Sequence, residues 1–216
     1  MYMPSKAFGV FNRNVKQVDK LIDAYNSLKT PQRGRKYLDH LTRSALVFLC
    51  SSWEVYLEQI TVECCEIIAR RLNSPKDLPE QVRKSISSAI KNAKHDLEPV
   101  TFAMDWKKYY CDYAKKYIEK LNTPKKGQVL EIFEKYLGAN IPQFKHDVPT
   151  LDKINDIVSL RGEIAHNIFA EEYLKVETVI ADKDTIMRLV KEIEIFLWGY
   201  LPGITNGKRP WQNTYR

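Results

Sequence analysis

The chain has 216 residues, of which 44% are hydrophobic and 28% are charged, and its formal net charge is +7. This composition is ordinary for a folded globular protein and excludes a disordered chain, while the basic charge permits a polyanionic partner such as nucleic acid without requiring one. The longest mainly apolar run, residues 44–53, is far shorter than the ~20 residues of a membrane-spanning helix, and residues 1–17 lack the apolar region of a signal peptide. We therefore expect a cytoplasmic protein that does not enter a membrane.

Apolar residues recur at spacings of three and four along most of the chain, which predicts helices and no strands. In chain order we predict helices at residues 6–28, 37–72, 80–94, 102–121, 129–137, from 150 to about 167, and 182–201. Segments with Pro, Gly or Asn separate most of them. The predicted fold is an all-α bundle with one domain, residues 1–202. Its core comprises residues 37–72 and 150–201, an additional helical segment occupies 73–149, and a mobile basic tail occupies 203–216.

The cysteines and histidines, four of each, fall in no metal-ligand pattern. Cys50 and Cys64 occupy positions where small apolar residues would also serve, so we expect buried thiols there. We expect no metal site and no cofactor.

The stretch "LRGEIAHN", residues 160–167, places Arg161 and His166 near the end of a predicted helix. Basic residues are favoured at a helix C-terminus by its dipole, so the pair alone does not establish a function. Positions five apart lie about 140° from each other around a helix, so the two side chains flank one stripe rather than share it. A two-fold dimer in which two such helices meet would bring the Arg of one chain near the His of the other.

A guanidinium beside an imidazole suits cleavage of RNA without a metal ion. Histidine titrates near neutrality and can accept the 2′-hydroxyl proton or protonate the leaving oxygen. Arginine forms two hydrogen bonds to phosphate oxygens and stabilises the negative charge that develops on the phosphoryl group. The reaction would be an internal transesterification in which the RNA supplies the nucleophile.

"IVSLRGEIAHN", taken with "SALVFLCSSWEVYLEQI" upstream, resembles the HEPN superfamily and most closely its RiboL-PSP-type branch. The resemblance covers residues 37–72 and 150–201. It implies an all-α bundle that forms a homodimer through its Arg-x4-6-His helices, and a metal-independent endoribonuclease activity with RNA as the substrate. It also implies a role in toxin–antitoxin or antiviral defence systems, with an antitoxin or defence protein as a further partner. Arg161 and His166 fall on the motif positions.

The sequence departs from the family pattern beside each motif residue. Gly162 stands where the family usually has a polar residue, and Asn167 stands where it often has glycine. We predict that Glu163 partly substitutes as a catalytic-site carboxylate, because a nearby negative charge favours the imidazolium. Asn167 is assigned to RNA binding together with Arg161.

Three further candidates lie outside the motif. Glu54, in "SSWEVY", is the acidic position to which the resemblance points, and it either pairs with Arg161 or a lysine or supports the catalytic site. Lys107 and Lys108, in "WKKYYCDYAKKYIEKL", are candidate RNA-binding residues on a basic face. The tyrosines among these lysines recur on one helical face, so an amphipathic helix explains them better than base stacking does.

Two alternatives to a nuclease remain open from the sequence. One is a non-catalytic module of the same fold that binds RNA or a protein, which Gly162 favours. The other is an interaction subunit in which the motif is only a helix end.

Overall fold

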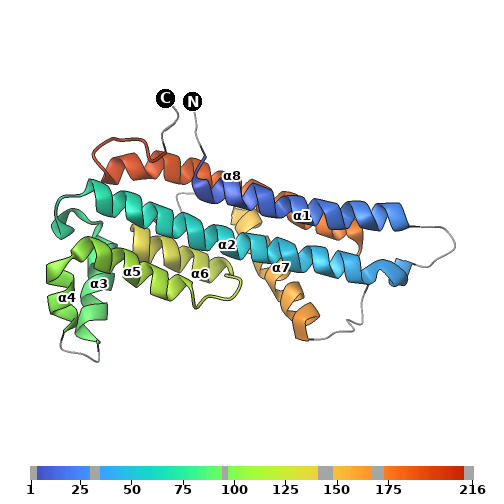
Figure 1. The fold of residues 1–216 in the computed structure, drawn as a ribbon, viewed down its shortest axis with the longest axis horizontal. Coiled ribbons are helices and arrows are strands. Elements are labelled where there is room, and N and C mark those ends of the chain that lie inside the picture. The colour runs from blue at the N-terminus through green and yellow to red at the C-terminus, as the bar shows by residue number, and fades with distance from the viewer. Residues whose placement is uncertain (1–3, 30–34, 94–96, 141–147, 167–172, 212–216) are drawn as a thin grey trace.

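The computed structural model describes residues 4–29, 35–93, 97–140, 148–166 and 173–211. Within them lie eight α-helices and no strand, which confirms the predicted all-α fold. Three long helices, α1 (Lys6–Leu28), α2 (Asp39–Arg71) and α8 (Val176–Ile204), run along the long axis of the molecule (Figure 1). The shorter helices α3 to α6 gather at one end, and α7 (Val148–His166) crosses α2 near its middle.

Helix α1 forms because its apolar residues recur every three or four positions and give it one buried face. That face carries Ala7, Phe11, Val15, Val18, Ile22 and Tyr25. The hydroxyl of Ser5 accepts a hydrogen bond from the backbone N–H of Phe8 and so caps the first turn. The buried face of α1 packs along α2.

Helix α2 is the centre of the bundle, since α1, α5, α7 and α8 all contact it. Sixteen of its 33 residues are buried, among them Trp53, Tyr56 and Ile60, none of which is exposed to solvent. A helix that is covered on several faces cannot show a single apolar stripe, and this explains why apolar residues surround much of α2.

The segment at 73–149 packs against α2 and shares its core. It contains α3 (Glu80–Lys91), α4 (Glu98–Met104), α5 (Trp106–Ile118) and α6 (Lys126–Ile132), which continues into a π-helical turn, η3 (Phe133–Leu137). Short 3-10 turns, η1 (Arg35–Leu38) and η2 (Pro75–Asp77), precede α2 and α3. Tyr110 and Ile118 of α5 are fully or almost fully buried.

Several helix boundaries differ from the sequence prediction by a few residues, and the largest differences concern the helix predicted at 102–121 and helix α8. The helix predicted at 102–121 is divided at Asp105, whose carboxylate accepts a hydrogen bond from the N–H of Lys108 and starts α5 anew. Helix α8 begins at Val176 rather than at 182 and continues past Leu201, because Pro202 is accommodated in its last turn.

The predicted mobile tail requires correction over its first nine residues. Residues 203–204 belong to α8, and Gly207 then adopts a left-handed backbone, with φ of 75°. The guanidinium of Arg71 donates hydrogen bonds of 2.6 Å to the carbonyls of Lys208 and Arg209. Trp211 stacks on Trp198 and is 7% exposed, so the chain is packed up to this residue; residues 212–216 lie outside the described ranges.

No helix in the described parts of the chain combines the length and the apolar character that crossing a bilayer requires.

Candidate functional site

The first half of α7 anchors the motif helix in the core. Leu151, Ile154, Ile157 and Val158 are all buried, at helical spacing. Arg161 follows Ile154 by seven residues and therefore lies only about 20° from it around the helix. Arg161 thus continues the buried stripe towards the C-terminal end of α7. Helix α7 extends beyond α2 on the side away from α1 and α8 (Figure 1).

Arg161 is half-buried, and its Nε is buried without a hydrogen-bond partner in the described part of the structure. No ion pair with a described residue engages its guanidinium either. A buried N–H donor without a partner costs free energy, so such a group is commonly matched by water or a ligand. The structure therefore shows no anionic partner for this guanidinium among the described residues.

Cys50 of α2 lies close enough to Arg161 to be affected by its charge. Burial raises the pKa of the Cys50 thiol to about 12, while the positive charge of Arg161 acts in the opposite direction. The thiol is therefore protonated and uncharged at neutral pH, and it does not neutralise the guanidinium. Asp182 of α8 also acts on Cys50, and burial raises the pKa of the Asp182 carboxyl group.

The other motif residues occupy the last turns of α7. Gly162 is half-buried, and a Cβ at this position would meet nothing within 4 Å. Glu163 is exposed to solvent. His166 is the last residue of the helix; its side chain and Asn167 lie outside the described part of the structure. The helix therefore brings Arg161, Gly162, Glu163 and the backbone of His166 to one projecting end.

One interpretation of the sequence expected Glu54 to pair with Arg161 or with a lysine. Within the described ranges the structure shows no such ion pair. Its Oε2 accepts hydrogen bonds from the backbone N–H and the hydroxyl of Thr123, at 2.8 and 2.7 Å. The preceding residue, Trp53, donates from Nε1 to the carbonyl of Pro124 at 3.0 Å. These neighbouring residues of α2 hold the turn between α5 and α6, and one backbone N–H and one hydroxyl, both from Thr123, bind the Glu54 carboxylate in place of a cation.

The same turn contacts α7, which sequence reasoning did not foresee. The Nζ of Lys125 donates to the Ser159 hydroxyl at 2.9 Å, and the backbone N–H of Lys126 donates to Asn155 Oδ1 at 3.0 Å. The ammonium of Lys126 also pairs with Asp152. The only sequence signal was the basic turn "NTPKKG", which gives no indication of its partner helix.

Lys107 and Lys108 lie apart from the motif. They belong to the start of α5, which lies next to α4 at one end of the molecule, whereas the motif end of α7 projects below the middle (Figure 1). The Nζ of Lys107 sits 5.6 Å from the ring centre of Trp106, and Lys108 is exposed. Tyr110 of the same helix is fully buried and donates to the Tyr136 carbonyl, as the amphipathic interpretation requires.

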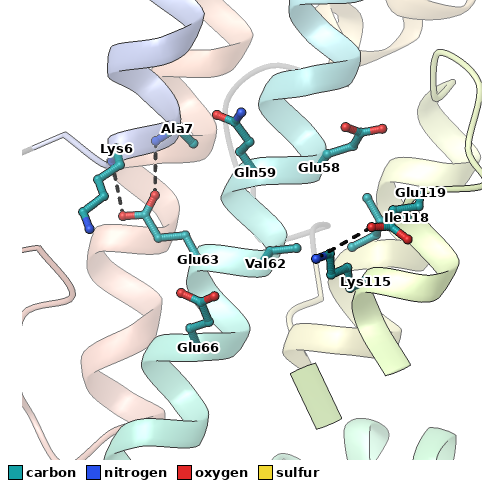
Figure 2. Close-up of a pocket in the computed structure, with 10 residues that line it drawn as sticks. All are labelled: Lys6, Ala7, Glu58, Gln59, Val62, Glu63, Glu66, Lys115, Ile118 and Glu119. Carbon is teal, nitrogen blue, oxygen red and sulfur yellow. Dashed lines mark hydrogen bonds and ion pairs between the residues drawn. The ribbon is translucent and has the colours of Figure 1, made fainter. Parts of the chain in front are cut away.

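A pocket of about 390 Å³ lies between the start of α1, the middle of α2 and the end of α5 (Figure 2). Its charged lining residues are Lys6, Glu58, Glu63, Glu66, Lys115 and Glu119. Glu63 points to the start of α1, where its carboxylate accepts the N–H groups of Lys6 and Ala7. Burial raises the pKa of Glu58, and the charges of Glu54 and Glu119 add to this effect. With four carboxylates against two ammonium groups, the pocket repels phosphate and does not suit RNA.

In the part of the chain that the structure describes, no group of three or more His, Cys, Asp or Glu side chains is arranged to hold a metal ion.

Comparison with known proteins gives one match. The family model described as RiboL-PSP-HEPN matches residues 12–198, which is most of the chain. No curated protein and no solved structure matches the sequence.

Proposed function

Since the chain belongs to the RiboL-PSP-HEPN family, we propose that it is a metal-independent endoribonuclease in which Arg161 and His166 form the catalytic pair. One observation carries the proposal: the guanidinium of Arg161 is held at the end of a buried stripe, with a buried and unpartnered Nε, on the part of α7 that projects from the bundle. His166 follows on the same helix end.

In this reaction an imidazole accepts the proton of the RNA 2′-hydroxyl, and the resulting oxygen attacks the adjacent phosphorus. The bond from phosphorus to the 5′-oxygen breaks, and that oxygen takes up a proton from a protonated imidazole or from water. The products are a 2′,3′-cyclic phosphate and a 5′-hydroxyl. Arg161 binds the phosphate and stabilises the extra negative charge of the transition state. Glu163 favours the charged form of the imidazole.

The direct test incubates the purified protein with RNA in EDTA and identifies the product ends. We expect 2′,3′-cyclic phosphates from the unmodified protein and none from His166→Ala or Arg161→Ala. Arg13→Ala, which removes an exposed arginine from α1, is the matched control and should cleave normally. Cleavage that survives unchanged in His166→Ala would contradict the assignment.

We further propose that two copies of the chain form a homodimer and that each site combines Arg161 of one copy with His166 of the other. Neither single variant then has an intact site, but a mixed dimer of Arg161→Ala and His166→Ala has one. Random exchange of subunits should restore about a quarter of the activity, because half the dimers are mixed and each has one intact site of two. If mixing restores nothing although subunits exchange, each site lies within one chain.

A non-catalytic binding module is the second candidate, and Gly162 is the observation that favours it. The glycine removes the polar side chain that family members usually carry beside the motif arginine. Space is free for that side chain, since a Cβ at 162 would meet nothing within 4 Å. RNA binding without cleavage, together with cleavage gained by Gly162→Asn, would identify the protein as such a module.

We also propose a biological role, as a toxin or a component of a defence system, and this part of the proposal rests on family resemblance alone. Growth arrest on expression, abolished by His166→Ala, would support it. Normal growth alongside cleavage in vitro would contradict it.

A further inference from the structure

The turn that joins α5 to α6 has an unusual backbone. Thr123 has φ of 41°, in the left-handed region that β-branched residues rarely adopt. It also precedes Pro124, and the residue before proline prefers an extended backbone. Two residues of α2 nevertheless hold the turn in this shape, through the bonds of Glu54 to Thr123 and of Trp53 to Pro124. Strain that the surroundings maintain in this way often marks a functional segment.

The turn in this shape brings Lys125 and Lys126 into contact with α7. The two ammonium groups have different partners. The ammonium of Lys126 pairs with Asp152, whereas that of Lys125 forms no ion pair with a described residue and donates to the neutral hydroxyl of Ser159. An ammonium group has three donors, so Lys125 retains two for another acceptor. Lys125 is also exposed, so a ligand can reach it.

The contact point at Ser159 is in register with the end of the motif helix. Position 166 lies seven residues further on, which is about 10.5 Å along the helix and about 20° around it. Gly162 lies between them and contributes no side chain. Three carboxylates, those of Asp152, Asp156 and Glu163, lie about 20° to 60° to the other side of Ser159, and that of Asp152 is paired with Lys126. The strip from Ser159 through Gly162 to position 166 carries no carboxylate of its own, and the exposed Glu163, four residues after Ser159 and three before position 166, borders it.

We propose that Lys125 binds a phosphate of the RNA strand that flanks the scissile linkage, and that Glu54 and Thr123 are positioning residues that hold Lys125 against α7. The inference rests on the proposed function, because it assumes that RNA is bound at the motif end of α7. A phosphate contact at this distance from the motif orients the strand without reading its sequence.

The test measures binding of a single-stranded RNA oligonucleotide to the His166→Ala protein in EDTA, at several KCl concentrations. Adding Lys125→Gln removes one phosphate contact, so affinity should fall about 5-fold to 10-fold at low salt, and the slope of log K against log [salt] should decrease by about 0.7. Lys16→Gln, which removes an exposed lysine from α1, is the matched control and should leave the slope unchanged. Equal slopes with and without Lys125 would overturn the inference.

The positioning role has its own prediction. Glu54→Gln should lower the salt slope as Lys125→Gln does, and the double variant should bind no more weakly than either single variant, because both changes remove the same contact. Thr123→Val removes the hydroxyl that donates to Glu54 Oε2, so it should lower the slope in the same direction as Glu54→Gln. A slope that Glu54→Gln leaves unchanged would restrict Glu54 to a structural role and overturn that part of the inference.

Binding is measured without turnover, so the two proposals can fail separately. If the unmodified protein cleaves RNA but the slope does not depend on Lys125, the nuclease proposal stands and the inference fails. If the protein never cleaves RNA but the slope depends on Lys125, the phosphate contact stands and the nuclease proposal fails.

Discussion

Two buried ionisable side chains, Glu194 in the bundle formed by α1, α2 and α8 and Arg161 near the projecting end of α7, differ in their hydrogen bonding. In the bundle, the fully buried carboxylate of Glu194 on α8 accepts hydrogen bonds from Ser5, through both its backbone N–H and its hydroxyl, and from the Tyr56 hydroxyl. At the end of α7, the buried Nε of Arg161 has no partner in the described part of the structure.

The backbone differs at one point: helix α1 begins with a capping serine, whereas the turn against α7 contains a left-handed threonine. Helical glycines occur in both regions, at Gly9 of α1, Gly199 of α8 and Gly162 of α7. The left-handed threonine and the unpartnered Nε each cost stability. If RNA is bound at the end of α7, as proposed above, changes there should affect activity, whereas changes in the bundle should affect folding.

The largest expected effect is on activity at the α7 end. Arg161→Met keeps most of the buried aliphatic stem but removes the guanidinium, so RNA cleavage should fall about 1,000-fold, as when a transition-state donor is lost. The free energy of unfolding should be unchanged or higher, since a buried unpaired donor disappears. Product formation and urea denaturation measure the two quantities. A large loss of stability would show that Arg161 is a structural residue and would remove the contrast between the two regions.

The opposite result is expected in the bundle. Glu194→Ala leaves three donors, from Ser5 and Tyr56, without their acceptor and should lower the free energy of unfolding by about 3 kcal/mol or more. Cleavage per folded molecule should not change, because Glu194 lies outside the motif. Urea denaturation measures the loss, and activity normalised to the folded fraction supplies the second readout. A loss below about 1 kcal/mol would mean that water replaces the carboxylate.

The sequence predicted those features that depend on local periodicity, and it missed those that depend on distant partners. The stripe of α1 and the apolar positions of α7 follow from burial at a spacing of three and four, so these helices were placed within a few residues. The partner of Glu54 was not predictable, because Thr123 is 69 residues away in the sequence. Thr123 also has a left-handed backbone, whereas a residue before proline usually has an extended one. The packed tail depends in the same way on Arg71, which is more than 130 residues from the carbonyls it holds.

The residues of the candidate site remain a prediction from the sequence, and the structure describes part of their environment. Arg161 and His166 were assigned from residue types and family resemblance, and the structure adds that Arg161 lies at the end of the Ile154 stripe. The seven-residue spacing between Ile154 and Arg161 would have allowed this placement to be predicted. The contact between Lys125 and Ser159 could not be predicted, since the sequence of a basic turn does not indicate which helix it contacts.

A smaller effect is expected where Gly162 weakens the motif helix. Gly162→Ala should raise the free energy of unfolding by about 0.5–1 kcal/mol, because glycine is disfavoured in helices and the added Cβ meets nothing within 4 Å. Gly199→Ala, inside α8, is a matched helical control with equally free space and should gain a similar amount. RNA affinity separates the two variants: only Gly162→Ala narrows the strip between Lys125 and the end of α7. Equal RNA affinities would show that the strip does not contact the strand.

The smallest effect is expected at Asp182, where the bundle meets α7. Burial raises the pKa of this carboxyl group, while the charges of Lys153 and Asp156 on α7 oppose and reinforce the shift, respectively. Because the folded protein binds the proton more tightly than the unfolded chain does, the contribution of Asp182 to stability decreases as the pH rises from about 3.9 through the native pKa. Asp182→Asn removes this penalty, so it should stabilise the protein more at pH 7 than at pH 4, as followed by urea denaturation at both values. An equal change in the free energy of unfolding at both pH values would mean that hydrogen bonds or charges around Asp182 already compensate its burial. Asp182 would then resemble Glu194 of the bundle rather than Arg161.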